Sequence, residues 1–214
     1  MKKIVVATTN QNKVKRLKAL LSHLNYEIVS LEEINTKNIE EPVETASTPV
    51  SIAMEKALHY VDYLPIDTII LSQDDTIEFE GVNEEDNPGI HIKGPIIKKY
   101  GKFTDELAAE YYKSLAAKYG GVISMTFKYG HAIAVKYRDG RDVTKVVGAE
   151  SKLKARLVNK INKLETVSGY FLAALMEVNI NGKWIPYNEL DDETLVRLDK
   201  DLQDSIMTLL KNIE

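Results

Sequence analysis

One short run of the sequence constrains the fold most: Ile4-Val5-Val6-Ala7 is continuously apolar, and three of its four residues are β-branched. A strand with one face in water alternates apolar and polar side chains, whereas a strand of a parallel sheet is buried on both faces. The run therefore predicts a buried parallel strand. The polar segment Thr8 to Asn12 follows it, and apolar residues then recur at steps of three and four, which predicts an amphipathic helix capped by Asn10 or Asn12. The helix carries Val14, Leu17, Leu21 and Leu24.

The same order of strand and helix continues through the first half of the chain. A second strand is expected over 27–31, and a second helix starts at Pro49 after a Ser47 or Thr48 cap. Another buried strand covers 68–71 and is expected to end at Gln73-Asp74-Asp75-Thr76. Short helical segments are expected over 95–100 and 105–119.

The second half has a different pattern. Residues 122–129 and 131–138 alternate like two half-buried strands, and Asp139-Gly140 and Asn181-Gly182 are typical hairpin turns. A closing amphipathic helix is predicted from a cap near Asp191 or Asp192. Its apolar stripe is Leu195, Leu198, Leu202, Ile206 and Leu209. We therefore expect an α/β fold in which a mixed twisted sheet is flanked by helices, as a single domain over residues 1–214.

The composition is that of a soluble globular protein, with 44% hydrophobic and 28% charged residues. The formal net charge of −4 favours neither nucleic acid nor an anionic membrane as a partner. The absence of cysteine excludes disulfides, thiolate metal sites and a cysteine nucleophile. With an N-terminal apolar run too short for a signal peptide and no stretch of about 20 apolar residues, a cytoplasmic location is expected.

Three segments could carry chemistry. The turn Thr8-Thr9-Asn10-Gln11-Asn12-Lys13 lies between a strand and a helix, where backbone amides, the helix dipole and a lysine suit phosphate oxygens. The alternative is a polar helix cap with a solvated lysine. The pair Asp74-Asp75 at the end of a buried strand could hold Mg²⁺ or activate a water, or be an acidic junction before a turn. The loop 40–44 could supply a further oxygen ligand, or be a solvated surface loop.

Taken together, these segments resemble the inosine triphosphatase family, the pyrophosphatases of non-standard purine nucleoside triphosphates. The matching motifs, in chain order, are Thr8, Asn10 and Lys13 in the first turn, Glu44 in the acidic loop, Lys56-Ala57 in the second helix, Asp74-Asp75-Thr76, and a Pro-Gly turn with a lysine, Asn87-Pro88-Gly89-Ile90-His91-Ile92-Lys93. They cover residues 1–101. The resemblance implies two lobes with a central nucleotide-binding cleft, a magnesium-dependent reaction on a nucleoside triphosphate, and a homodimer.

The carboxyl-terminal half departs from the family pattern. Where the family has an aromatic and glycine-rich stretch ending in Tyr-Asp-Pro, this chain has Ser168-Gly169-Tyr170-Phe171. Where the family has Ser-His-Arg, this chain has Leu195-Val196-Arg197 and keeps only the arginine. The residues expected to bind phosphate and metal are thus retained, whereas those expected to bind the base differ.

The resemblance implies a role for each retained residue. Glu44 and Asp75 would bind Mg²⁺, and Asp75 would also orient or deprotonate the attacking water, with Lys13 as its catalytic partner. The predicted substrate-binding residues are Thr8, Thr9, Asn10, Lys13, Lys56, Thr76, Lys93, Tyr170 and Arg197. For Tyr170, Phe171 and Arg197 the alternative is a hydrophobic strand and a solvated arginine.

The predicted function is hydrolysis of non-standard purine nucleoside triphosphates to the monophosphate and pyrophosphate. Three rivals are a catalytically silent homologue that binds nucleotides as a sensor or partner protein, a pyrophosphatase of another nucleotide, and an α/β phosphatase with Asp74 or Asp75 as nucleophile.

Overall fold

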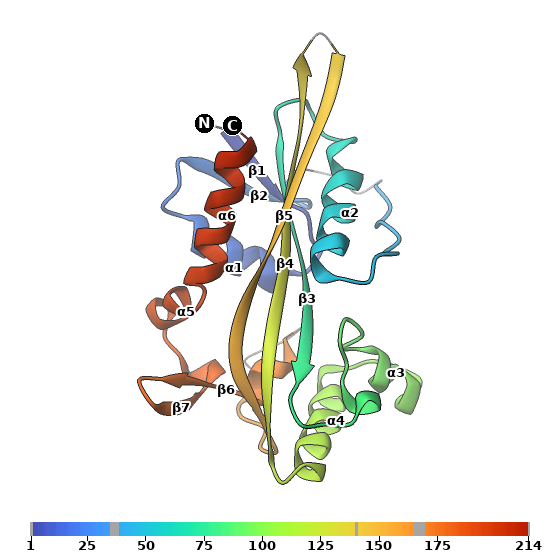
Figure 1. The fold of residues 1–214 in the computed structure, drawn as a ribbon, viewed down its shortest axis with the longest axis vertical. Helices are drawn as coiled ribbons and strands as arrows, with labels where there is room; N and C mark the ends of the chain where they lie inside the picture. The colour runs from blue at the N-terminus through green and yellow to red at the C-terminus, as the bar shows by residue number, and fades with distance from the viewer. Residues whose placement is uncertain (1, 35–38, 140, 165–169, 214) are drawn as a thin grey trace. The chain divides into compact units, whose positions relative to one another are not determined.

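The computed structural model describes residues 2–34, 39–139, 141–164 and 170–213. Their strands form a seven-stranded sheet in the order β2-β1-β3-β4-β5-β6-β7, with parallel and antiparallel pairs and flanking helices (Figure 1). The predicted mixed α/β fold is confirmed. The elements in chain order are β1 (Lys2–Val6), α1 (Gln11–Leu21), β2 (Tyr26–Ser30), α2 (Pro49–Val61), β3 (Ile69–Phe79), η1 (Glu84–Asp86), α3 (Gly94–Tyr100), α4 (Asp105–Lys118), β4 (Val122–Asp139), β5 (Arg141–Val158), η3 (Phe171–Ala174), β6 (Met176–Ile180), β7 (Lys183–Pro186), η4 (Tyr187–Glu189), α5 (Asp192–Leu198) and α6 (Lys200–Ile213).

The chain divides into two compact units; three boundaries fall inside the long strands β3, β4 and β5, and the fourth lies between α5 and α6. The first unit contains residues 1–75, 129–151 and 199–214, and the second contains 76–128 and 152–198. None of the helices in the described ranges is long and apolar enough to cross a membrane.

In the first unit, β1 pairs in parallel with β2 on one side and with β3 on the other. Connections between parallel strands are right-handed. The step from β1 to β2 and the step from β2 to β3 run in opposite directions across the sheet, so α1 and α2 lie on opposite faces (Figure 1). Both faces of these strands are therefore covered, which explains why the sequence of β1 is continuously apolar.

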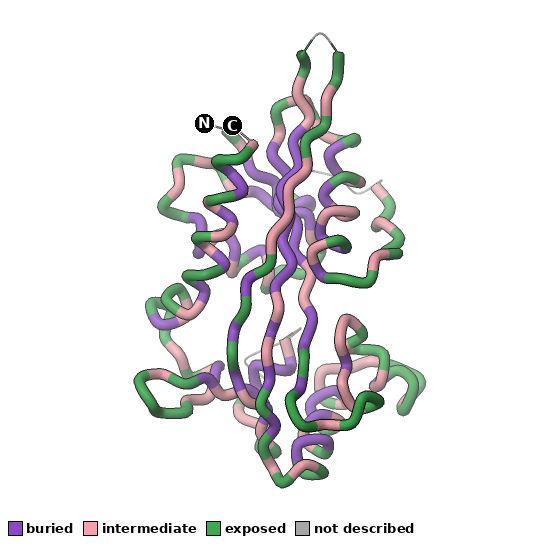
Figure 2. Tube along the Cα trace, in the orientation of Figure 1, coloured by how far each residue is buried: buried purple, intermediate pink, exposed green. Residues whose placement is uncertain are grey.

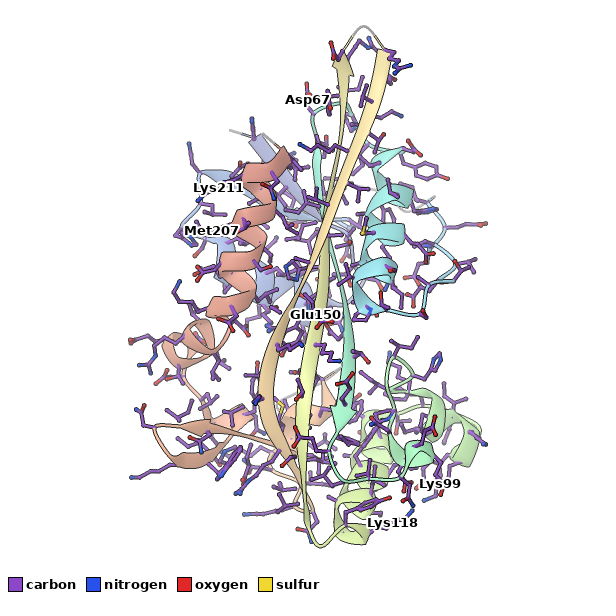
Figure 3. The ribbon with its side chains drawn as sticks, in the orientation of Figure 1. Asp67, Lys99, Lys118, Glu150, Met207 and Lys211 are labelled. Atoms are coloured by element: carbon purple, nitrogen blue, oxygen red, sulfur yellow. The ribbon has the colours of Figure 1, made fainter. Side chains whose placement is uncertain are left out.

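The alternation of side chains assigns the residues of β3 to the two faces. Ile70 packs in a buried cluster with Ala53 and Ala57 of α2, and the Ser72 hydroxyl donates to the backbone carbonyl of Ala53. Within residues 69–75 of β3, which belong to the first unit, even-numbered residues therefore face α2 and odd-numbered residues face α1. Most residues of β3 and the inner sides of α1 and α2 are buried (Figure 2), whereas charged residues such as Lys211 on α6 lie outside (Figure 3).

The strand β3 is longer than predicted. It was expected to end at 73–76, but it continues to Phe79, because Ile77 and Phe79 are buried on either side of the exposed Glu78 and Ile77 bridges to Gly89. Its parallel pairing with β1 ends at Leu71, opposite Val6. The aspartates therefore lie past the end of β1 but within β3.

One uninterrupted strand, β4, replaces the two that were predicted on either side of Gly130. A Cβ atom at Gly130 would lie 2.1 Å from the backbone carbonyl carbon of Pro49, the first residue of α2. The glycine thus permits close approach of a helix and does not mark a turn. The predicted turn at Asp139-Gly140 lies between β4 and β5, with Gly140 outside the described residues, and Asn181-Gly182, with φ angles of 51° and 84°, joins β6 and β7 as predicted.

The predicted closing helix is two helices, α5 and α6, separated at Asp199. Asp191 caps α5, since its carboxylate accepts from the amide of Thr194 at 2.7 Å. Asp199 is 5% exposed, and its carboxylate accepts two bonds of 2.5 Å from the Arg16 guanidinium of α1. The ion pair with Arg16 therefore holds Asp199 at the break between α5 and α6, where one continuous helix was predicted.

The second unit packs α4 and the 3₁₀ helix η3 against its strands. Phe171 stacks on Tyr112 of α4 with ring centroids 5.6 Å apart, and both rings are buried. The segment that contains Phe171 is therefore part of a core, in a 3₁₀ helix and not in the hydrophobic strand considered as an alternative.

Candidate functional site

The turn after β1 is organised by its own polar side chains. Asn10 caps α1, since its carboxamide oxygen accepts from the amides of Asn12 at 3.0 Å and Lys13 at 3.3 Å. The Thr8 hydroxyl accepts from the amide of Asn10 at 3.2 Å. Thr9 and Asn10 are exposed. Because Asn10 already binds two amides of the first helical turn, an anion at this end of the helix would depend strongly on side chains.

Lys13 meets Asp75 at the edge of this turn. The Lys13 ammonium lies 2.9 Å from Oδ2 of Asp75, and the Gln73 carboxamide donates to Oδ1 of the same carboxylate at 2.6 Å. Burial would raise the pKa of Asp75, but the charge of Lys13, the hydrogen bonds from Gln73 and Lys13 and the nearby Arg16 outweigh it and hold this pKa below its usual value. Asp75 is therefore ionised at neutral pH.

Lys56 of α2 makes the second pair, with Asp74. Its ammonium lies 2.7 Å from Oδ1 of Asp74 and 2.7 Å from Oε1 of Glu44. Burial raises the pKa of Asp74 even though Lys56 opposes it, whereas the pKa of Lys56 is raised because Asp74 and Glu44 outweigh the effect of burial. Lys56 therefore stays charged between two carboxylates.

The two aspartates thus serve opposite faces of β3, as the alternation of a strand requires. Asp75 binds a lysine of α1 and Asp74 binds a lysine of α2. The site lies where β1 has turned away into α1 and β3 continues, next to the point at which the strand order reverses. Ligands of open α/β sheets bind at such a switch point.

The oxygen ligands at this site suit a hard divalent cation. Glu44 and Asp74 approach the same ammonium, so two carboxylates converge on one positive charge. Within the described ranges, no group of three or more Asp, Glu, His or Cys side chains could hold a metal by itself. Mg²⁺ commonly takes only one or two carboxylates and completes its shell with water and substrate phosphates. The residues therefore fit a metal ion that binds together with a polyphosphate.

The remaining predicted residues belong to the second unit. Thr76 is buried and follows Asp75 on β3. The Lys93 ammonium lies 5.0 Å from the centre of the Phe103 ring, and the ring of Tyr170 meets that of Tyr187 edge-on at 5.9 Å. Arg197 is exposed on α5 and donates to the Thr194 hydroxyl at 3.0 Å. Ser168 and Gly169 lie outside the described residues.

Two residues next to the predicted ones were missed. Gln73 precedes Asp75 by two positions, which on a strand places both on one face. Arg16 follows Lys13 by three positions, so both lie on one side of α1. The spacing of these residues was visible in the sequence, but their polar partners were not.

The fold and these contacts define a class: an α/β protein whose first strand–turn–helix unit sets cations against carboxylates at a topological switch point. The chain belongs to the Ham1 family, whose characteristic sequence pattern matches residues 4–165. The predicted family resemblance is thereby confirmed.

Curated relatives match in part of the chain. A dITP/XTP pyrophosphatase of Vibrio cholerae serotype O1 (strain ATCC 39315 / El Tor Inaba N16961) is 36% identical over 91 residues, which is 42% of this chain and 42% of that protein. A dITP/XTP pyrophosphatase of Vibrio parahaemolyticus serotype O3:K6 (strain RIMD 2210633) is 42% identical over 59 residues, or 28% of each. The chain thus spans less than half the length of the curated relatives it matches.

Solved structures share the fold over the whole chain. A HAM1 protein from Coxiella burnetii superposes with a TM-score of 0.64 at 15% identity, over 99% of this chain and 100% of that one. The Ham1 protein of Staphylococcus aureus gives a TM-score of 0.63 at 19% identity and covers both chains completely.

Proposed function

We propose that this chain hydrolyses non-standard purine nucleoside triphosphates to the monophosphate and pyrophosphate, and so removes them from the nucleotide pool. The observation that carries the proposal is the double pairing of Lys13 with Asp75 and Lys56 with Asp74 on either side of one strand. Membership of the Ham1 family and the partial match to dITP/XTP pyrophosphatases support it.

In the proposed reaction, a water oxygen attacks the α-phosphorus and the bond from that phosphorus to the bridging oxygen of the β-phosphate breaks. Pyrophosphate leaves, and the proton of the water passes to the Asp75 carboxylate, which is ionised beforehand. Lys13 and Lys56 hold phosphate oxygens, since an ammonium has three donors and can bind a carboxylate and a phosphate together. Thr8, Thr9 and Asn10 add hydrogen bonds from the first turn.

Mg²⁺ would be held by Glu44 and Asp75, as the family resemblance implies. The contacts bring Glu44 to Asp74 through their shared Lys56 and leave Asp75 with Lys13 on the other face of β3, so binding by both ligands requires the ion to lie past the end of β1, where it can reach both faces. When bound, the ion neutralises phosphate charge and the charge that develops on the leaving group. The chain's own cations supply the rest of that stabilisation. Removing one such electrostatic contact typically lowers kcat by about 100- to 1,000-fold.

Recognition of the base is assigned to residues of the second unit. Tyr170 would stack on the purine and Arg197 would donate to its exocyclic oxygen, while Thr76 and Lys93 would contact the substrate. Phe171 is left out of this role, because its ring is stacked within the core. The proposal also includes a homodimer, as the family resemblance implies, and the cytoplasmic location expected from the sequence.

The second candidate is a silent nucleotide-binding homologue, favoured by the altered triplet at Leu195-Val196-Arg197. One assay separates the two. The protein is incubated with Mg²⁺ and inosine, xanthosine, adenosine, guanosine and modified pyrimidine triphosphates, and pyrophosphate and orthophosphate are measured separately.

Selective release of pyrophosphate from the inosine and xanthosine forms supports the proposal. Pyrophosphate from a modified pyrimidine alone would indicate another substrate, and orthophosphate alone a phosphatase. Thermal stabilisation by nucleotide without turnover would establish the silent binder.

A further inference from the structure

The face of β3 towards α1 carries a buried amide that the proposed reaction does not use. Gln73 is 3% exposed and lies two residues before Asp75, so both side chains leave the strand on the same side. We propose that Gln73 is a positioning residue of this site: its carboxamide sets the orientation of the Asp75 carboxylate towards the reacting water. The inference rests on the proposed hydrolysis and goes beyond it by adding a residue.

The two oxygens of Asp75 have different partners. Oδ2 binds Lys13 at 2.9 Å, and Oδ1 accepts from Nε2 of Gln73 at 2.6 Å. Two contacts at opposite ends of a carboxylate fix the rotation of its plane, which one ion pair to a flexible lysine would leave free. When a phosphate draws the Lys13 ammonium towards itself, Gln73 still holds Oδ1.

A neutral amide suits this task because it donates a hydrogen bond without neutralising the carboxylate. A lysine or arginine at position 73 would add a further positive charge against Asp75 and weaken it as a base. The orientation of the amide is also fixed, since the reversed amide would direct its own oxygen at the carboxylate.

The oxygen of the Gln73 carboxamide indicates that this glutamine has a functional role and not a stabilising one. Its Oε1 atom is buried and accepts no hydrogen bond from the described part of the chain. A buried acceptor without a partner lowers stability, and an apolar side chain of the same length would avoid this cost. A glutamine that destabilises the fold on one side and binds Asp75 on the other is expected where activity and stability compete.

The test replaces Gln73 by Met, which has similar length and no amide. The matched control is Gln203→Met, because the Gln203 amide donates to the Leu20 carbonyl at 2.7 Å, away from Asp75. For each protein, kcat and KM for inosine triphosphate and the midpoint of thermal unfolding are measured in the presence of Mg²⁺.

For Gln73→Met we expect kcat to fall by roughly 10- to 100-fold with KM within about twofold of the native value. Its unfolding midpoint should be unchanged or higher. Gln203→Met should keep its kcat and lose some thermal stability. A native kcat in Gln73→Met, or a loss of kcat matched by a loss of folded protein, overturns the inference while the proposed function stands.

A native chain that releases no pyrophosphate from any triphosphate refutes the proposed function instead. The hydrogen bond between Gln73 and Asp75 is then tested by a double-mutant cycle of Gln73→Met and Asp75→Ala in thermal unfolding. Non-additive shifts of the unfolding midpoint support an interaction between Gln73 and Asp75, and additive shifts overturn the inference.

Discussion

The pair between Arg16 and Asp199 should contribute strongly to the stability of the first unit. Asp199 receives two bonds of 2.5 Å from Arg16, its side chain is 6% exposed, and the guanidinium lies 4.4 Å from the centre of the Tyr129 ring. The substitution Asp199→Asn removes the charge and turns an amide N–H towards an arginine, which has no acceptor.

The size of the loss follows from burial. Removing one partner of a fully buried pair costs about 3–5 kcal/mol, because a charge is left unpaired. Arg16 is 20% exposed and keeps its contact with the aromatic ring, so we expect a smaller loss of about 2–3 kcal/mol in the free energy of unfolding. For a chain of this length that corresponds to roughly 5–10 °C in Tm.

The assay is thermal and urea unfolding followed by circular dichroism. Asp204→Asn is the matched control, since Asp204 pairs with Lys200 on the same helix at 2.7 Å but both side chains are more than half exposed. That variant should lose less than about 0.5 kcal/mol. The double substitution of Arg16→Met with Asp199→Leu should recover much of the loss, because an apolar pair leaves no charge unpaired. The reasoning is refuted if Asp199→Asn is as stable as Asp204→Asn.

Three further predictions concern the site and the core. Asp75→Asn should lower kcat for pyrophosphate release by about 100- to 1,000-fold with the fold retained by circular dichroism, and normal turnover would remove Asp75 from the reaction. His131 is fully buried and its ring binds Ser205, and burial lowers its pKa, with the Tyr129 carbonyl opposing. The contribution of neutral His131 to the free energy of unfolding should therefore be fully present above about pH 6.5 and fall as the pH drops below it, since the unfolded chain binds the proton more readily. Urea unfolding midpoints at pH 7.5 and 5.5 measure this loss. The substitution His131→Asn should reduce the difference between the two midpoints. Gly130→Ala should destabilise by about 1–3 kcal/mol because its Cβ meets the backbone of Pro49, and unchanged unfolding would contradict that packing.

Local patterns in the sequence predicted the elements that depend on local physics. The continuous run in β1, the Asn10 cap of α1 and the Thr48 cap with Pro49 at the start of α2 all follow from neighbouring residues. The pairing of Lys13 with Asp75 was also predictable, because both lie just past the stretch in which β1 and β3 pair in parallel. Roles in binding and catalysis remain predictions.

The errors arose where distant residues decide the structure. Two strands were predicted over 122–129 and 131–138, whereas the structure has one strand through Gly130, which makes room for Pro49, some eighty positions earlier in the chain. The break at Asp199 depends on Arg16 at the other end of the chain. The continuation of β3 to Phe79 depends on Gly89 and on the core of the second unit. None of these partners could be identified from a local window of sequence.

The opposed directions of Asp74 and Asp75 have a consequence for how this segment can change over time. A strand repeats every two residues, so deleting or inserting one residue between Leu71 and Asp74 would send each carboxylate to the wrong helix and separate both lysines from their partners at once. A change of two residues would keep the faces but move each carboxylate along the strand by about 6.6 Å, away from its lysine, so sequence drift here is confined to substitutions. The spacing from Leu71, the last residue paired with β1, to the two aspartates should therefore be constant in length.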